Sequence, residues 1–328
     1  MAVQWPDESM FNNFTVFKES FKTVGSHDIG AAILVPKNVQ PGKRPVIVNL
    51  HGGFLVNGHS LFAPFFSPWV LKLALEESAV VISGDYRLLP TANGVADQLE
   101  DIEDFWQWTR NKLPAIFEGR APGFSLDLTR LLLAGSSAGG YCAVQLGLSH
   151  PEEISAMAMA YPFVNPADEV IVNGPKDGEP TILRFPLDTL PSKEAVVAWI
   201  DESRKEVTSQ ADMDRGAFAA AAAQYGLYYS HLFDNRSLKR PEFLPLLRIK
   251  AGAKLPPKIW ILTGDDDSVV YLRTIQEFVD LSREKLPRTT IRLDIAPGED
   301  HAFDHTKSTW ELHAIGAMGF VKQSWLGI

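Results

Sequence analysis

A serine stands at the centre of a Gly-x-Ser-x-Gly pattern within residues 135–140, Gly-Ser-Ser-Ala-Gly-Gly. A largely apolar run at 130–134 directly precedes the pattern, so we expect a buried strand there, a sharp turn at the serine and a helix after it. Glycines two positions to either side let neighbouring chains approach a strained turn, which holds the hydroxyl exposed at its tip. Only Ser137 has glycines at both distances, whereas Ser136 has neither, so Ser137 is the predicted nucleophile.

The predicted base for Ser137 is His301. A serine hydroxyl is a weak nucleophile near neutral pH, and it needs a histidine that is itself oriented by a carboxylate. In chains that use this turn, the carboxylate follows the serine and the histidine comes last. His301 lies in the turn-rich loop 297–303 directly after a predicted strand, at the sheet edge where active sites of α/β proteins gather. His305 and His313 come nearer to the next helix, and we expect both at the surface.

Three consecutive aspartates supply candidates for the carboxylate. Asp265, Asp266 and Asp267 follow the predicted strand 259–263, at the same edge of the sheet as His301. Asp267 directly precedes an apolar helix start and can point back toward the histidine, so it is the favoured partner. Asp266 is the second candidate, and for the remaining aspartates we expect stabilisation of the helix N-terminus by about 0.3–1 kcal/mol. Because no further ligand set accompanies them, they do not predict a metal site.

Two backbone segments supply candidate donors for the oxyanion of an acyl-transfer intermediate. The amide of Ala138 follows the nucleophile at the start of a predicted helix, and Gly52 and Gly53 follow the predicted strand 46–50. Glycines allow such a loop to turn its amides inward, and loss of one such donor typically slows the reaction by about 10²–10³-fold. We expect His51 to fix this loop by hydrogen bonding and not to act as a base.

Short β-branched runs alternate with longer amphipathic stretches along the chain. The runs are typical of strands buried on both faces of a parallel sheet, and the stretches of helices that flank it. A short Gly-Ser-His-Asp turn joins the first two strands, so these should pair antiparallel. The sequence therefore predicts an α/β fold with a mostly parallel eight-stranded sheet. Its predicted strands are 14–24, 31–35, 46–50, 79–83, 130–134, 154–160, 259–263 and 290–295, and its predicted helices are 94–117, 138–149, 269–285 and 308–325.

Residues 166–250 break this alternation and indicate a helical lid or cap insertion within a single domain of residues 1–328. Loops rich in proline and glycine come first, followed by predicted helices at 193–207, with Ser192 as N-cap, and at 213–227. The insertion is rich in aromatic residues, which either form a small core of their own or line a substrate cleft beneath the lid. The candidates for substrate binding, in the insertion and near the nucleophile, are Phe54, Ser136, Trp199, Tyr225 and Tyr229.

The predicted helix 94–117 carries four acidic side chains on one face. They recur mostly three and four positions apart, the spacing that places side chains on the same side of an α-helix. We expect this face to be solvated. The four residues are Asp97, Glu100, Asp101 and Asp104.

The chain has 328 residues, with 31 Lys and Arg against 40 Asp and Glu, and a formal net charge of −9. This acidic balance argues against nucleic-acid partners and against docking on anionic lipid. A single cysteine, Cys142, rules out an internal disulfide and a Cys-based zinc site, and we expect a buried structural thiol. Without a secretory signal or an apolar run near the ~20 residues of a membrane span, we expect a cytoplasmic protein with no stable membrane insertion. The sequence leaves open whether the protein forms a homodimer.

Four sequence blocks occur in one order and together span nearly the whole chain. They are His51-Gly52-Gly53, Gly84-Asp85-Tyr86-Arg87-Leu88-Leu89-Pro90, the segment 135–140, and Asp267 with His301. In these blocks the chain resembles the hormone-sensitive-lipase-like esterases, a group of the α/β-hydrolase fold (alpha/beta hydrolase fold-3). The resemblance implies a serine esterase with a catalytic triad of Ser137, Asp267 and His301, an oxyanion hole, a lid domain and no cofactor. It also implies that Asp85 and Arg87 tie loops together near the site.

Three features depart from the pattern of this group. Phe54 stands where a third glycine is usual, and Ser136 stands where an acidic residue usually precedes the nucleophile. Only about a dozen residues precede the first predicted strand, so the segment 166–250 has to supply most of the lid. These departures leave the substrate class open.

The expected function is hydrolysis of carboxylic esters of small to medium apolar substrates through an acyl-enzyme, as in a carboxylesterase. A formamidase or amidase, a lactonase, or an acyltransferase in secondary metabolism would use the same triad, and these alternatives stay open. The alternative from another class is a non-catalytic ligand-binding receptor on the same scaffold. A receptor predicts a lost nucleophile or base, and here both residues are present.

Overall fold

The computed structural model describes residues 5–234, 240–306 and 310–327. At its centre is one eight-stranded sheet in the order β1-β2-β4-β3-β5-β6-β7-β8. β2 runs antiparallel to β1 and β4, and all the other pairs are parallel, so the predicted mostly parallel sheet is confirmed. The strands are β1 Phe14–Val24, β2 His27–Pro36, β3 Gly42–Leu50, β4 Val80–Gly84, β5 Phe124–Ser136, β6 Ala156–Ala160, β7 Lys258–Gly264 and β8 Thr290–Ala296.

Helices cover both faces of the sheet, which is why the central strands β3 and β5 carry apolar, buried runs in their second halves. Every residue of β4 and β6 is buried. The helices α2 Val95–Asn111, α4 Ala138–Ser149 and α9 Leu272–Lys285 contribute to the core on one face, and α1 Pro68–Glu76 and α11 Trp310–Leu326 to the core on the other. Among the described residues, no helix combines the length and apolar character that crossing a membrane requires.

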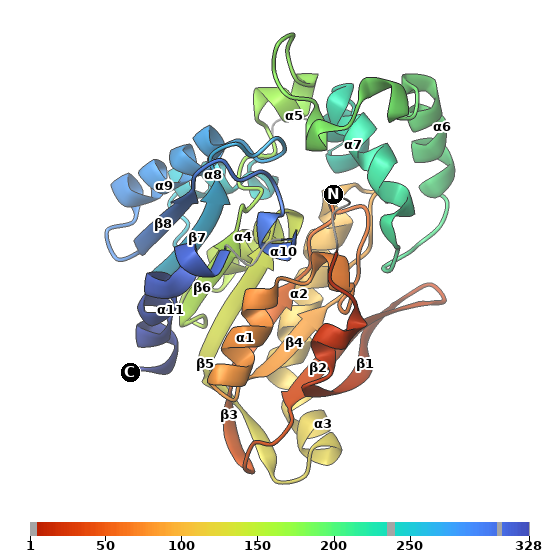
Figure 1. Ribbon diagram of the computed structural model, residues 1–328. Coiled ribbons are helices and arrows are strands. Elements are labelled where there is room, and N and C mark those ends of the chain that lie inside the picture. The colour runs from red at the N-terminus through yellow and green to blue at the C-terminus, as the bar shows by residue number, and fades with distance from the viewer. Residues whose placement is uncertain (1–4, 235–239, 307–309, 328) are drawn as a thin grey trace.

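The segment 166–250, called the insertion below, lies between β6 and β7 and contains four α-helices among its described residues. They are α5 Glu169–Asn173, α6 Lys193–Ser203, α7 Gly216–Gln224 and α8 Pro245–Lys250. The predicted cap is confirmed, since the Ser192 hydroxyl accepts a hydrogen bond from the amide of Ala195 at 3.2 Å. Figure 1 shows α5, α6 and α7 grouped at one end of the sheet.

Two helices that begin with a proline in their first turn differ from the predicted helices. The predicted helix 94–117 is two helices, α2 and α3 Leu113–Arg120, because Pro114 lies in the first turn of α3 and cannot continue the hydrogen bonding of α2. Helix α1 was not predicted, although Pro68 at its first position is a typical start signal. The predicted helix 308–325 corresponds to α11, and Ser308 lies outside the described residues.

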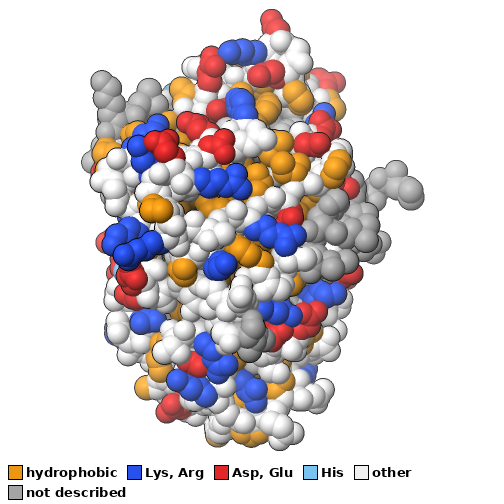
Figure 2. Space-filling model, turned by 90° about the vertical axis from the view of Figure 1, so that its left-hand side faces the viewer, with side chains coloured by type: hydrophobic (Ala, Val, Ile, Leu, Met, Phe, Trp, Pro, Cys, Tyr) orange, Lys and Arg blue, Asp and Glu red, His pale blue; other side chains and the backbone are white. Residues whose placement is uncertain are grey.

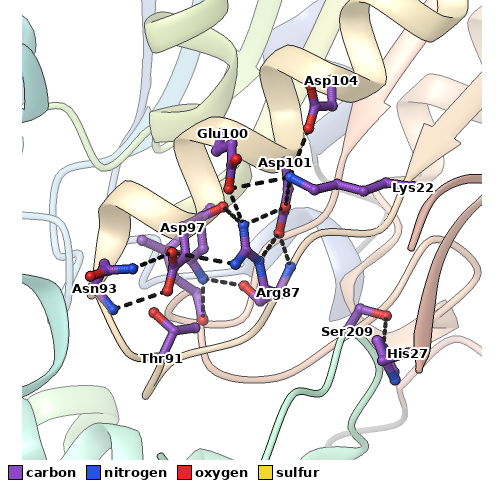
Figure 3. Close-up of polar contacts among 12 residues, drawn as sticks. Lys22, His27, Arg87, Thr91, Asn93, Asp97, Glu100, Asp101, Asp104 and Ser209 are labelled. Atoms are coloured by element: carbon purple, nitrogen blue, oxygen red, sulfur yellow. Dashed lines mark hydrogen bonds and ion pairs between the residues drawn. The ribbon is translucent and has the colours of Figure 1, made fainter. Parts of the chain in front are cut away.

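The predicted solvated acidic face is wrong for two of its four residues. Asp97 and Asp101 are buried, whereas Glu100 and Asp104 are exposed. The Arg87 guanidinium donates to Asp101 through Nε and Nη2 at 2.8 Å each, and Lys22 lies 2.8 Å from the same carboxylate (Figure 3). The two carboxylates are buried because Arg87, from the loop before α2, pairs with both of them and Lys22, from β1, pairs with Asp101.

Candidate active site

Ser137 occupies the turn between β5 and α4, where the sequence pattern places it. Its backbone has φ of 53° and ψ of −121°, a strained conformation that aims the side chain away from both elements. A side chain at Gly139 would collide with the carbonyl oxygen of Leu50, and one at Gly135 would collide with that of Gly139. The two glycines therefore permit the close approach of α4 to the end of β3 on which this turn depends.

The side chains of Ser137, His301 and Asp267 form one line of hydrogen bonds. His301 lies after β8 and Asp267 after β7, so both reach the sheet edge at which β5 ends. His301 Nε2 lies 3.0 Å from Ser137 Oγ, and His301 Nδ1 lies 2.9 and 3.1 Å from the two oxygens of Asp267. Asp266, the second candidate, instead points to the surface, where it pairs with Arg184.

The environment of Asp267 determines which nitrogen of His301 carries the proton. The Asp267 side chain is fully buried, and Oδ1 also accepts hydrogen bonds from the amides of Val269 and Val270 at 2.9 and 2.8 Å. An ionised carboxylate only accepts, so Nδ1 of His301 has to donate to it. Nε2 is then left with a lone pair that faces the Ser137 hydroxyl.

A buried polar group behind His301 was missed in the sequence. The ring of Tyr161 packs against that of His301 with centroids 4.5 Å apart, and the Tyr161 hydroxyl donates to Asp304. The Trp69 indole donates to the other oxygen of Asp304 at 3.1 Å. Burial raises the pKa of Tyr161 well above its ordinary value, so the phenol stays a donor. Only the proximity of Asp304 to His301 in the sequence could have drawn attention to it.

The expectation that His305 lies at the surface is wrong. Its side chain is buried beside Asp304, and burial lowers the pKa of the imidazole. The short helix α10 Phe303–Thr306, which carries His305, packs against α1. The side chain of His313 lies outside the described residues.

The loop after β3 brings Gly52 next to the nucleophile. A Cβ atom at Gly52 would lie 3.6 Å from that of Ser137, and in the described chain no protein group accepts a hydrogen bond from the amides of Gly52, Gly53 or Ala138. His51 contacts the carbonyl of Gly52 through Nδ1 at 2.8 Å, and the Tyr86 hydroxyl donates to the carbonyl of His51 at 2.7 Å. Burial lowers the pKa of His51 to about 3, so a neutral ring shapes this loop.

A narrow apolar pocket, partly open to solvent, lies beside Ser137. Phe54, a predicted substrate contact, is part of its wall. From the insertion, Tyr228 lines the pocket and its hydroxyl donates to the carbonyl of Phe54 at 2.5 Å. The lining residues are Phe54, Ser137, Ala138, Phe163, Ile171, Ala223, Tyr228, Val269 and Val270. None of these side chains is charged.

Comparison with known families matches residues 47–303 to the family described as alpha/beta hydrolase fold. The chain belongs to this family. The α/β hydrolase is 30% identical over 336 residues to the probable carboxylesterase M8 of a Phoma species, a match that covers 98% of this chain and 100% of that one. It is 33% identical over 207 residues to the probable carboxylesterase clz11 of Cochliobolus lunatus, covering 60% and 88% of the two chains.

Solved structures share the fold of this α/β hydrolase. An esterase from Pyrobaculum calidifontis superposes with a TM-score of 0.62 at 20% sequence identity, over 97% of this chain and 88% of that chain. At this identity the likeness concerns the fold alone. It is consistent with the strand order and with the predicted eight-stranded α/β-hydrolase architecture.

Four predicted substrate contacts of this α/β hydrolase do not line the pocket. Trp199 stacks on Phe218 with centroids 5.1 Å apart, and Tyr229 is fully buried. Tyr225 is half-buried at the end of α7. The Ser136 hydroxyl is buried 2.6 Å from that of Ser67. The aromatic composition of the insertion could not show that Tyr228, and not its neighbour, faces the nucleophile.

Cys142 of this α/β hydrolase is buried in α4, as expected for a structural thiol. Burial in an apolar environment raises the pKa of the thiol far above its ordinary value. A thiol that stays protonated is a poor nucleophile. Cys142 therefore acts through packing and not through chemistry.

Proposed function

We propose that this α/β hydrolase cleaves carboxylic esters of small to medium apolar substrates with Ser137 as nucleophile. One observation carries the proposal: the Ser137 hydroxyl, hydrogen-bonded through His301 to Asp267, opens onto an uncharged pocket. The curated relatives named as probable carboxylesterases support the same reaction. The insertion contributes Ile171, Ala223 and Tyr228 to the pocket wall, which supports a role as its lid.

In the proposed reaction each of these residues has one step. Ser137 Oγ attacks the acyl carbon of the ester while His301 Nε2 takes the hydroxyl proton, and Asp267 stabilises the imidazolium that forms. The amides of Ala138, Gly52 and Gly53 are the proposed donors to the oxyanion of the tetrahedral intermediate.

The intermediate collapses when the ester C–O bond breaks. His301 then gives its proton to the leaving alcohol, and an acyl-enzyme remains on Ser137. Water attacks this acyl-enzyme with His301 again as base, and the carboxylic acid leaves. An acceptor other than water would make the same chain an acyltransferase.

A chain-length series of p-nitrophenyl esters tests the proposal. We expect the wild-type protein to hydrolyse short acyl chains and Ser137→Ala to lose kcat by about 10⁴-fold or more. Ser136→Ala is the matched control, because its buried hydroxyl bonds to Ser67 and lies outside the pocket. A fluorophosphonate probe should label the wild type and Ser136→Ala but not Ser137→Ala. Turnover by Ser137→Ala, or an unlabelled folded wild type, would refute the proposal.

A further inference from the structure

One arginine of the insertion contacts both loops that carry the His301–Asp267 pair. Arg184 Nε donates to Asp300 Oδ2 at 2.8 Å. Its Nη2 donates to the backbone carbonyl of Asp266 at 3.0 Å and lies 2.7 Å from the carboxylate of Asp266. Asp300 directly precedes His301, and Asp266 directly precedes Asp267. A single planar guanidinium therefore joins the residues next to the base and next to its carboxylate.

The carboxylate of Asp300 continues this connection into the site. Its Oδ1 accepts hydrogen bonds from the amide of His301 at 2.7 Å and from the amide and hydroxyl of Ser268 at 2.8 and 2.9 Å. Burial would raise the pKa of Asp300, but these hydrogen bonds and Arg184 outweigh it and hold the pKa below its ordinary value. Asp300 is thus an ionised group that fixes the backbone of His301 to the loop of Asp267.

The segment that carries Arg184 is held firmly to the insertion. Ile182 is fully buried, and its amide donates to the side chain of Gln224, at the end of α7, at 3.0 Å. The hydroxyl of Thr181 donates to the carbonyl of Phe185 at 2.8 Å. Leu183 and Arg184 have φ of 55° and 54°, a conformation that side chains other than glycine adopt only when their surroundings require it.

The position of α7 is linked to the pocket as well as to Arg184. Ala223 on α7 lines the pocket beside Ser137, and the adjacent Gln224 holds the Arg184 segment. The same helix therefore lines the pocket and is connected, through the segment of Arg184, to the loops of His301 and Asp267.

We propose that Arg184 is a positioning residue that clamps the His301 and Asp267 loops when the insertion is docked over the pocket. This inference rests on the proposed function, because it concerns the rate of the Ser137 reaction. The rigid fork of a guanidinium fixes the separation of its acceptors, which a flexible amine does not. The side chains of Arg184, Asp266 and Asp300 are 42, 60 and 35% exposed, so the ion pairs contribute little to global stability. Their effect is local, on the alignment of the base.

A second arginine pair provides a matched control. Arg273 on α9 also bridges to the insertion, through Nη2 to Asp168 Oδ1 at 2.9 Å, and its side chain is 47% exposed. Its partner Asp168 is not adjacent in the sequence to His301 or to Asp267. Arg273→Gln thus removes an arginine–aspartate pair whose arginine is similarly exposed, without loosening the two loops.

The experiment compares Arg184→Gln, Arg184→Lys and Arg273→Gln with the wild type on a neutral short-chain ester. We expect Arg184→Gln to lower kcat by about 3- to 10-fold with KM within twofold, because misalignment of the base affects the chemical step. Labelling by a fluorophosphonate should slow by the same factor. Arg184→Lys should recover only part of the rate, and Arg273→Gln should stay within twofold of the wild type.

A double-mutant cycle with Asp300→Asn separates positioning from a general loss of structure. The asparagine retains an oxygen that can accept from the amide of His301 but loses the charge that pairs with Arg184. If the clamp acts through this pair, the two substitutions together should cost less than the product of their separate effects on kcat. Thermal unfolding of each variant checks that the fold is intact.

The outcomes distinguish this inference from the proposed function. Wild-type kcat in Arg184→Gln, or an equal loss in Arg273→Gln, would overturn the clamp while leaving Ser137 as the nucleophile. A raised KM with unchanged kcat would also overturn it, since Arg184 would then act on substrate binding. A wild type without turnover or labelling would instead overturn the proposed function itself.

Discussion

The loop 51–58 after β3, called the oxyanion loop below because its amides are the proposed oxyanion donors, depends on one residue that has to be glycine. Gly53 has φ of 106°, and a side chain there would collide with the backbone carbonyl of Asn57. Its own carbonyl accepts from the amides of Val56 and Asn57 at 2.9 and 3.0 Å, so the turn is closed on itself. Because Asn57 is buried, the collision can be relieved only by moving the loop that presents Gly52 and Gly53.

We therefore expect Gly53→Ala to lower kcat by about 10²–10³-fold, the usual effect of losing one oxyanion donor. Gly252→Ala is the control, since Gly252 has a similar φ of 96° but open space around it. That substitution should cost about 1 kcal/mol of stability through backbone strain and leave kcat unchanged. Ester turnover and urea unfolding of both variants measure the two effects. Equal kcat in the two variants would show that the loop tolerates a side chain and does not act as described.

At the scale of elements, a buried ion cluster connects β1, the loop after β4 and helix α2. The side chain of Asp101 is fully buried, accepts hydrogen bonds from the Arg87 guanidinium and from the backbone amide of Arg87 at 2.9 Å, and lies 2.8 Å from the ammonium of Lys22. Desolvation would lower the pKa of Arg87, but Asp101 and its acidic neighbours outweigh burial and raise it. Removal of Asp101 would take from both cations the fully buried carboxylate that they share, and leave Lys22 with the more exposed Glu100 and Asp104.

Asp101→Ala should accordingly lower the free energy of unfolding by about 3–5 kcal/mol, the usual cost of breaking a buried ion pair from one side. Asp104→Ala is the matched comparison, because it faces the same Lys22 at 2.7 Å with a side chain that is 48% exposed. An exposed pair contributes about 1 kcal/mol or less. Chemical denaturation gives both values, and similar losses in the two variants would contradict the argument from burial.

The elements most predictable from the sequence are those whose own residues determine their environment. β4 and β6 are buried on both faces, and their unbroken apolar runs could be recognised without knowing their neighbours. Ser137 was predictable for a similar reason, since the glycines that its turn requires are adjacent in the chain.

Features that depend on distant residues were not predictable. The acidic face of α2 is part of the core only because Arg87 and Lys22 reach it, and the sequence spacing of the acids carries no trace of these partners. Tyr228 and Arg184 face the candidate site because of the path that the insertion takes around α7. Neither residue lies at a position that the spacing of residues along the sequence would have identified as part of a site.

At the scale of the whole molecule, the sheet separates two apolar cores and charges are confined largely to the surface. On the face shown in Figure 2, acidic and basic side chains are interspersed and do not gather by sign. Buried titratable groups are therefore the main source of pH-dependent stability that the structure identifies. Two buried histidines, His51 and His305, and the half-buried His59 are of this kind, since desolvation lowers the pKa of all three.

The direction of their effect on stability depends on whether the folded or the unfolded state binds the proton at the higher pH. Below the ordinary pKa of 6.5 the unfolded chain protonates His51, whereas the folded protein does so only near its pKa of about 3. The free energy of unfolding should thus decrease as the pH falls from about 6.5 toward 3, and His51 contributes about 1.4 kcal/mol per pH unit to this decrease. His51→Gln removes one titrating group and should reduce this slope by about 1.4 kcal/mol per pH unit. The expectation concerns the slope and holds whether or not the substitution destabilises the protein at neutral pH.

His150 provides a control of opposite sign for urea unfolding across this pH range. Burial would lower its pKa, but Glu103 and Glu153 outweigh burial and raise it. The stability that His150 contributes is fully present below pH 6.5 and is lost as the pH rises through its folded pKa. His150→Gln should therefore lower the free energy of unfolding by a constant amount below pH 6.5, leave the acid slope unchanged, and change the slope only above pH 6.5, where the contribution of His150 is lost. If His51→Gln keeps the wild-type acid slope, the ring is not held neutral in the folded protein, and its part in shaping the oxyanion loop has to be assigned to its protonated form.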